Sequence, residues 1–222
     1  MRIGVYVGSF NPPHLGHVKV IEYLLEQHYV DKIEVIATGN YWDKTDLIDV
    51  KDRINMLKVY ETINVIINSA LNNLSYTYQI MNCLKEKYPN DELFLIIGDD
   101  NLPKFHLWKN YQEILNNQVI VLRRNDINIE DTVSYKLYSK KFVIVNDFPK
   151  IDISSTVIRK YLQVNRDYEA SLYLGFYVLA YIVNHNLYGV NSTISENKVN
   201  KLVCNIKSTK DDNVGKKLIK VK

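Results

Sequence analysis

Cysteine is scarce in this sequence, with Cys83 and Cys204 the two examples among 222 residues. Their wide separation argues against a disulfide framework. The chain also lacks a Cys-x-x-Cys pair or a Cys/His cluster with the spacing of a zinc site. This cysteine usage is typical of a protein from a reducing compartment, so we expect a cytoplasmic location.

Long hydrophobic runs are also missing. No uncharged apolar stretch reaches the roughly 18 residues that a membrane-spanning helix needs. The nearest is Ala170–Val183, which has helical character and several tyrosines. At the N-terminus, Arg2 is followed by a short apolar run that ends at Gly8, with no small-residue cleavage site of the kind that follows a signal peptide. We therefore expect no membrane partner.

Basic charge is not spread along the chain. The net charge is +3, yet residues 191–222 alone hold eight lysines against three acidic residues. The remaining body is therefore slightly acidic, which gives no support to nucleic-acid binding. The same 32 residues lose apolar periodicity, so we expect a polar, lysine-rich tail with the composition of a disordered segment, following a single domain over residues 1–190.

Short apolar runs alternate with stretches of helical periodicity along residues 1–190. Strand-like runs lie at 3–7, 33–37, 65–67, 93–97, 119–122 and 142–145, and helical spacing occurs at 18–27, 50–61, 77–87, 158–162 and 170–184. Ser75 is a candidate cap for the helix at 77–87. Continuous apolar strands separated by helices predict a Rossmann-like, doubly wound parallel α/β sheet with a C-terminal helical part.

The loop after the first strand, GSFNPPHLGH, has the features of an anion site. Ligands bind beyond the carboxyl ends of parallel strands, and Gly8 allows a sharp turn and a close approach there. The free N–H groups at a helix start favour anions. His14 and His17 share one face of the first helical turn and can donate to phosphate oxygens. Taken alone, the stretch also fits an ordinary strand-to-helix loop with incidental histidines; a metal pair lacks an evident third ligand.

This loop matches neither the dinucleotide pattern GxGxxG nor the P-loop. It resembles the Gly-x-Phe-Asp/Asn-Pro-x-His-x-Gly-His signature of the nucleotidylyltransferases, with Gly8, Phe10, His14, Gly16 and His17 in register. The departures are Val7, where a second glycine is frequent, and Asn11, where aspartate is common.

A second segment, ISSTVIRKYL, is similar to the C-terminal Ile-Ser-Ser-Thr-x-Ile-Arg motif of the nicotinate and nicotinamide mononucleotide adenylyltransferases. Independently of that likeness, Ser154 or Ser155 can cap a helix whose N-terminus favours an anion. Arg159, one turn further on, can bind two phosphate oxygens with its forked guanidinium. The same residues also fit a capped surface helix with a solvated arginine.

Further segments resemble the same family in the same order. ATGNYWDK contains Lys44, and SYTYQIMNCL contains Thr77. KDRINMLKVY is similar to an Arg-x-x-Met-Leu helix, and VIVLRR includes Arg124. FLIIGDDNLPKFHLW is similar to the Ile-Ile-Gly-x-Asp stretch and its following tryptophan, here Gly98, Asp100 and Trp108. Asp99 is an additional acid, and Lys109 stands where an aromatic residue is usual.

The resemblance implies transfer of an adenylyl group from ATP to nicotinic acid mononucleotide, which gives deamido-NAD and pyrophosphate. Catalysis would be assigned to His14, His17 and Arg159, with Mg²⁺ accompanying ATP. The residues implied in ATP binding are Gly8, Ser9, Phe10, His14, Gly16, His17, Gly98, Asp100, Ser155 and Arg159. Those implied in mononucleotide binding are Ser9, Phe10, Lys44, Thr77, Trp108 and Arg124.

Other functions stay open at this point. The chain also fits a nicotinamide mononucleotide adenylyltransferase or another enzyme with this loop, such as the pantetheine-phosphate type. A non-catalytic nucleotide sensor is a further alternative, although the intact His14, His17 and Arg159 argue against it. The sequence leaves open whether the chain forms homo-oligomers.

Overall fold

In the computed structural model, the residues described are 1–39, 47–125, 127–149, 153–164 and 166–190. Lys44 and the expected lysine-rich tail at 191–222 lie outside these ranges. Among the described residues, no helix is both long enough and apolar enough to cross a lipid bilayer.

Six parallel strands form one sheet in the order β3-β2-β1-β4-β5-β6. Their bounds are Arg2–Gly8 (β1), Lys32–Ala37 (β2), Val65–Ile67 (β3), Glu92–Gly98 (β4), Gln118–Leu122 (β5) and Phe142–Val145 (β6). The chain winds outward from β1 in one direction and resumes at β4 in the other. This order confirms the predicted doubly wound, Rossmann-like sheet.

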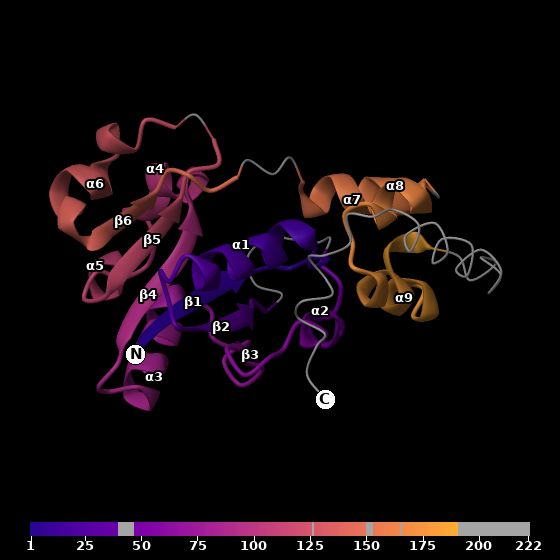
Figure 1. The fold of residues 1–222 in the computed structure, drawn as a ribbon, viewed down its shortest axis with the longest axis horizontal. Helices are drawn as coiled ribbons and strands as arrows, with labels where there is room; N and C mark the ends of the chain where they lie inside the picture. Colours follow the sequence, from indigo (N-terminus) through magenta and orange to yellow (C-terminus); the bar gives the residue numbers. More distant parts are fainter. Residues whose placement is uncertain (40–46, 126, 150–152, 165, 191–222) are drawn as a thin grey trace.

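Helices connect the strands and continue beyond the last one. They span Leu15–Glu26 (α1), Val50–Lys58 (α2), Thr77–Lys87 (α3), Leu102–Phe105 (α4), Tyr111–Ile114 (α5), Val133–Tyr138 (α6), Ser155–Gln163 (α7), Asp167–Ser171 (α8) and Phe176–Asn184 (α9), with 3-10 turns at Asp99–Asn101 (η1), Ile129–Asp131 (η2), Ser139–Lys141 (η3) and Leu187–Gly189 (η4). Figure 1 shows α7, α8 and α9 gathered at one end of the molecule.

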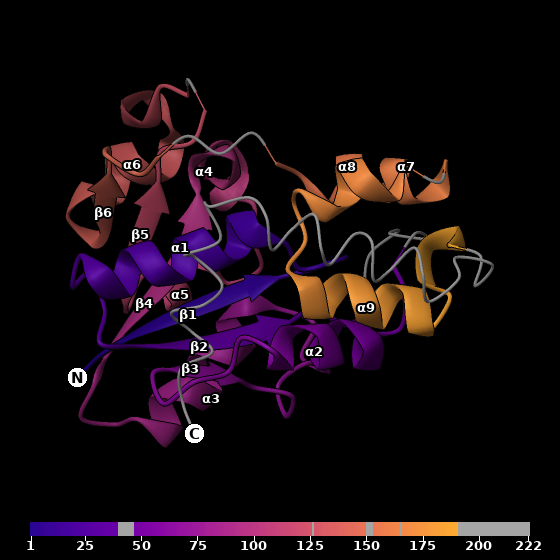
Figure 2. The same ribbon diagram turned by 45° about the vertical axis from the view of Figure 1, so that its right-hand side comes forward.

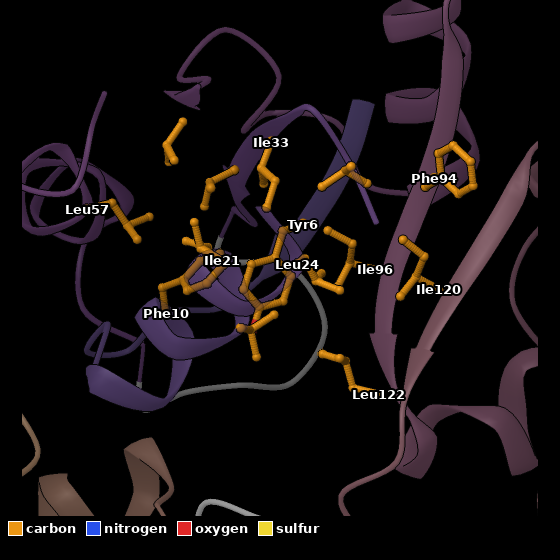
Figure 3. Packing of buried hydrophobic residues seen from close by; sticks show 14 of the residues in the cluster. Tyr6, Phe10, Ile21, Leu24, Ile33, Leu57, Phe94, Ile96, Ile120 and Leu122 are labelled. Atoms are coloured by element: carbon orange, nitrogen blue, oxygen red, sulfur yellow. The ribbon is translucent and has the colours of Figure 1, made fainter. Parts of the chain in front are cut away.

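Two apolar layers cover the two faces of the sheet. On one face, Ile21 and Leu24 of α1 and Leu57 of α2 pack against alternate strand residues such as Ile33 and Ile96 (Figure 3). On the other face, side chains of α3, α4 and α5 pack against the intervening strand residues. Strands covered on both sides must be apolar at nearly every position, which explains the continuous apolar runs in the sequence.

A third apolar cluster joins the C-terminal helices to the body of the domain. Ile158 of α7 and Ile182 of α9 belong to one buried group with Val18 of α1 and Met56 of α2. Figure 2 shows α9 lying beside α2. The helical part after β6 is therefore built onto the helices that lead away from β1 and β2.

The structure corrects two details of the sequence-based expectation. The predicted helix over 170–184 is divided into α8 and α9. The break at Gly175 makes room for Tyr60, because a Cβ at Gly175 would lie 2.5 Å from the Tyr60 hydroxyl oxygen. Ser75 is not the N-cap of α3; Tyr76 is, and its N–H donates to the Gln79 side chain at 3.1 Å.

Candidate active site

The carboxyl ends of β1 and β4 meet where the strand order changes direction. Tyr6 pairs with Ile96 across these strands, so Gly8 and Gly98, which end them, lie at the same edge of the sheet. This is the place where open parallel sheets bind ligands. A cavity of about 310 Å³ opens at this edge.

Four residues that sequence reasoning assigned to substrate binding line this cavity. They are Gly8, Ser9, Thr77 and Trp108. The remaining lining residues are Val7, Thr38, Gly39, Leu74, Ser75, Leu95, Ile96, Ile97 and Asn101. Apolar walls with a few hydroxyl, amide and backbone groups are typical of a small-molecule site. Lys109 is exposed and does not line the cavity.

His14 and His17 stack on each other at the start of α1. Their ring centroids lie 3.7 Å apart with an angle of 29° between the planes. The Gly16 N–H donates to His14 Nδ1 at 3.1 Å, and the His14 N–H donates to His17 Nδ1 at 3.2 Å. Since both Nδ1 atoms accept hydrogen bonds from the backbone, both protons are placed on Nε2. Each ring therefore offers one N–H donor to a ligand.

The surroundings of this histidine pair favour the neutral rings. Burial, helped by the positive charge of Arg124, lowers the pKa of His14 to about 4. Burial also lowers the pKa of His17 well below its usual value, and His14 and Arg124 add to this effect. At neutral pH the two side chains are uncharged hydrogen-bond donors, and close stacking brings no repulsion between cations.

The loop between β1 and α1 meets the N-terminus of α7. The Ser155 hydroxyl donates to the Pro12 carbonyl at 3.0 Å, and Arg159 Nη1 donates to the Asn11 carbonyl at 2.8 Å. Ser154 caps α7 by accepting from the Val157 N–H. The structure thus brings together the two motifs that the sequence separates by more than 140 residues.

Phe10 in the loop and Gly16 in the first turn of α1 are both buried. The Phe10 ring is buried and forms an edge contact with the Tyr6 ring at a centroid distance of 5.4 Å. Figure 3 shows Phe10 within the core cluster. Gly16 is buried and its N–H is used by His14. Only the backbone of Phe10 can therefore reach a substrate.

The edge formed by β4 and β5 carries an exposed ion pair. Arg124 Nη2 lies 2.9 Å from Asp100 Oδ1. A Cβ at Gly98 would lie 2.0 Å from Arg124 Nη2, so the guanidinium sits directly above that glycine. Asp100 and Arg124, both predicted as ligand-binding residues, contact each other here.

Asp99 has a different role from its neighbour. It is fully buried and accepts from the Arg124 N–H at 3.2 Å, the Asn125 N–H at 2.9 Å and the Asn125 side chain at 2.8 Å. The carboxylate therefore fixes the turn after β5 from which Arg124 extends.

Sequence reasoning did not assign two residues outside the loop, Arg53 and Tyr188, to the site, although both hold the loop through hydrogen bonds. Arg53 Nη1 donates to the Ser9 carbonyl at 2.7 Å, and the Tyr188 hydroxyl donates to Asn11 Oδ1 at 2.8 Å. A signal for Arg53 was present, because helical spacing from Val50 through Leu57 places it on the buried face of α2. Asn11 belongs to the loop motif itself, and no local signal showed that Tyr188 would contact it.

The described residues include no group of three or more His, Cys, Asp or Glu side chains positioned to hold a metal ion. Around the loop, His14, His17, Ser155 and Arg159 supply imidazole, hydroxyl and guanidinium groups, which can donate hydrogen bonds. This donor set suits phosphate oxygens. A magnesium ion that accompanies ATP would be coordinated mainly by the nucleotide and water.

Comparisons with known proteins agree with this geometry. The sequence pattern of the cytidylyltransferase-like family matches residues 5–161. A protein of Flavobacterium johnsoniae described as a probable nicotinate-nucleotide adenylyltransferase is 35% identical over 179 residues, which cover 78% of this chain and 92% of the relative. A protein of Borreliella afzelii with the same description is 36% identical over 203 residues, covering 85% and 97%.

Among solved structures, the nicotinic acid mononucleotide adenylyltransferase of Plasmodium falciparum complexed with NaAD has the same fold. The TM-score is 0.70 at 23% identity, and the match covers 86% of this chain and 98% of that one. The loop motif, the α7 motif and the sheet order thus agree with both kinds of comparison. The chain belongs to the nicotinate-nucleotide adenylyltransferases of the cytidylyltransferase-like family.

Proposed function

We propose that this protein transfers the adenylyl group of ATP to nicotinic acid mononucleotide, with the Gly8–His17 loop as the centre of the reaction. The observation that carries this proposal is the contact between the loop and α7. It holds Arg159 against the loop that carries the stacked His14 and His17. Gly8 and Ser9 at the start of the same loop line the cavity, together with Thr77 and Trp108. One edge of the sheet thus offers donors for a triphosphate and an enclosed place for a second nucleotide.

In the reaction, an oxygen of the mononucleotide 5′-phosphate forms a bond to the α-phosphorus of ATP. The bond from the α-phosphorus to the bridging oxygen breaks, and pyrophosphate leaves with that electron pair. Such a step depends on positioning and on stabilising negative charge in the transition state. His14 and His17 donate through Nε2 to the α-phosphate region, and Arg159 contacts the departing β- and γ-phosphates with Ser155 beside it.

Magnesium is assigned to the substrate in this proposal. It supplies positive charge to the ATP oxygens when it is bound. The protein's own contribution is the set of neutral and cationic donors that hydrogen-bond to the ATP phosphate oxygens. Lys44 stays a proposed phosphate contact.

We assign the mononucleotide to the cavity. Trp108 packs against Phe105 at a centroid distance of 5.0 Å, which steadies its ring as a surface for a pyridine. Thr77 at the N-terminus of α3 offers a hydroxyl group to the mononucleotide. The scarcity of cysteine supports a cytoplasmic location for this reaction.

The test is pyrophosphate release from ATP and Mg²⁺ with three acceptors offered separately: nicotinic acid mononucleotide, nicotinamide mononucleotide and phosphopantetheine. We expect the highest kcat/KM with the nicotinate compound, and deamido-NAD as the product by mass. A preference for either of the other acceptors would contradict the proposed substrate. No turnover with any of them would favour a non-catalytic nucleotide sensor.

A further inference from the structure

Three backbone carbonyls of the β1–α1 loop accept hydrogen bonds from side chains far away in sequence. Ser9 accepts from Arg53 and Asn11 from Arg159, while Pro12 accepts from Ser155. The donors belong to α2 and α7. Distant parts of the chain thus help to shape the loop, in addition to its own local hydrogen bonds.

The backbone of this loop is strained at Phe10. Its φ is +46°, a region that bulky residues rarely adopt. Such conformations persist only where neighbouring structure holds them in place. Tyr188 in η4 is also in the left-handed region, with φ +58°. A residue with a positive φ therefore lies on each side of the contact between the loop and η4: Phe10 precedes Asn11 in the loop, and Tyr188 is in η4.

That contact is the hydrogen bond from the Tyr188 hydroxyl to Asn11 Oδ1 at 2.8 Å. The Ile48 N–H approaches the same oxygen at the longer distance of 3.4 Å. Burial raises the pKa of the Tyr188 hydroxyl, so it remains a protonated donor at any pH where the enzyme works. Of the two contacts to Asn11 Oδ1, the hydrogen bond from the Tyr188 hydroxyl is the shorter.

Asn11 connects this bond to the catalytic groups. Its carbonyl holds Arg159, and it follows Phe10, whose ring forms an edge contact with the His17 ring at a centroid distance of 4.9 Å. A shift of Asn11 would therefore move Arg159 and the support of His17 together.

We propose that Tyr188 is a positioning residue for adenylyl transfer, because its hydroxyl fixes Asn11 and thereby the geometry of His17 and Arg159. This inference rests on the proposed function. It extends the site to η4. Tyr188 itself does not touch the reacting atoms.

The test is Tyr188→Phe, which removes the hydroxyl oxygen and keeps the ring. We expect kcat to fall about tenfold, equivalent to about 1.4 kcal/mol in the barrier, with KM for ATP changed less than twofold. The melting temperature should change little. A kcat equal to that of the unmodified protein would overturn the proposal.

Tyr181→Phe provides a matched control. The Tyr181 hydroxyl also links the C-terminal helices to α2, since it donates to Asp52 Oδ1 at 2.8 Å and accepts from Asn55 Nδ2 at 3.0 Å. It makes no contact with the loop in either bond. We expect unchanged kcat for this variant. An equal loss of kcat in both variants would mean that the tyrosines only stabilise the fold, and would overturn the proposal.

A double-mutant cycle separates positioning from general stability. In an Asn11→Ala background, adding Tyr188→Phe should change kcat by less than twofold, because the acceptor is already absent. A further tenfold loss would contradict a path through Asn11.

A measurement without turnover separates this inference from the proposed function. The imidazole ¹H–¹⁵N signals of His14 and His17 in the ligand-free protein should shift in Tyr188→Phe and stay in place in Tyr181→Phe. If the unmodified protein releases no pyrophosphate with any acceptor, the proposed function fails, and these signals alone decide the structural claim. Unshifted signals in Tyr188→Phe would overturn it.

Discussion

The two sides of the active-site edge are built in different ways. On one side, the loop from Ser9 to His17 is largely buried, donors from α2 and α7 fix its backbone, and a donor from η4 holds the Asn11 side chain. On the other side, Asp100 and Arg124 form an exposed pair at the ends of their side chains. The first side is preorganised for charge that develops during the reaction, whereas the second can rearrange at small cost.

This difference fits what each side must do. In the proposed reaction, the loop side holds phosphate oxygens in a fixed geometry while bonds change. At the other side, the Arg124 guanidinium covers Gly98, one of the residues that the family resemblance implied in ATP binding. We therefore expect ATP binding at Gly98 to require opening of the Asp100–Arg124 pair.

Removing a donor from the fixed loop should have the largest effect. We expect His17→Ala to lower kcat by about 10² to 10³-fold, or about 2.7–4 kcal/mol, because a preorganised donor to the transition state is lost. The variant should still fold, since its neighbours Phe10 and Val18 keep their apolar contacts. The measurement is pyrophosphate release together with circular dichroism.

His185→Ala is the matched control for that variant. His185 is exposed on the C-terminal side of α9 and stacks on Tyr181, away from the loop. We expect wild-type kcat from it. A folded His17→Ala protein with near-normal turnover would remove His17 from the proposed mechanism.

Substitution of the adjacent Asp99 and Asp100 should lower the free energy of unfolding by clearly different amounts. Asp99→Ala removes a buried carboxylate and leaves two partly buried backbone N–H groups without their acceptor, so we expect the free energy of unfolding to fall by about 2–3 kcal/mol. Asp100→Ala removes an exposed ion pair, and we expect a loss below about 1 kcal/mol. Urea unfolding followed by fluorescence measures both. Equal losses in the two variants would contradict the different roles assigned to the buried Asp99 and the exposed Asp100.

The pH dependence of stability tests the burial of a histidine of the fixed loop. The unfolded His14 has its ordinary pKa near 6.5, and the folded one has a pKa of about 4. Between these values the unfolded chain binds a proton that folded His14 does not. Stability should therefore fall as the pH decreases through this window, by up to about 1.4 kcal/mol per pH unit, and this contribution should level off below pH 4.

His14→Asn isolates the contribution of that histidine. Asparagine can still accept from the Gly16 N–H as a helix cap, but it does not titrate. We expect a shallower loss of melting temperature between pH 6.5 and 4 than in the unmodified protein. Identical slopes would mean that protonation of the buried His14 imidazole does not destabilise the folded protein.

Much of the fold was predictable from the sequence because its strands are covered on both faces. Continuous apolar runs located all six strands, and the 65–67 and 142–145 runs match β3 and β6 at both ends. The short helices α4, α5 and α6 were not predicted, since four to six residues are too few to establish a helical period. The break at Gly175 depends on Tyr60, a distant residue, and local periodicity could not indicate it.

The candidate site was predictable only where a motif names its residues. His14, His17, Ser155 and Arg159 were identified as two separate anion-binding segments, and the structure places these segments in contact. The support from Tyr188 depends on a hydrogen bond across 177 residues, which no local pattern encodes. Likewise, two adjacent aspartates look equivalent in sequence, and the turn after β5 decides which one is buried.

The contacts that shape the loop also set the order in which the protein becomes active. During synthesis the loop is made long before its partners Ser155, Arg159 and Tyr188, because each of them follows the loop residue that it contacts by more than 140 residues. All six strands of the sheet also precede these partners, since β6 ends at Val145. We therefore expect a growing chain to form the sheet before the loop acquires the contacts that fix its geometry.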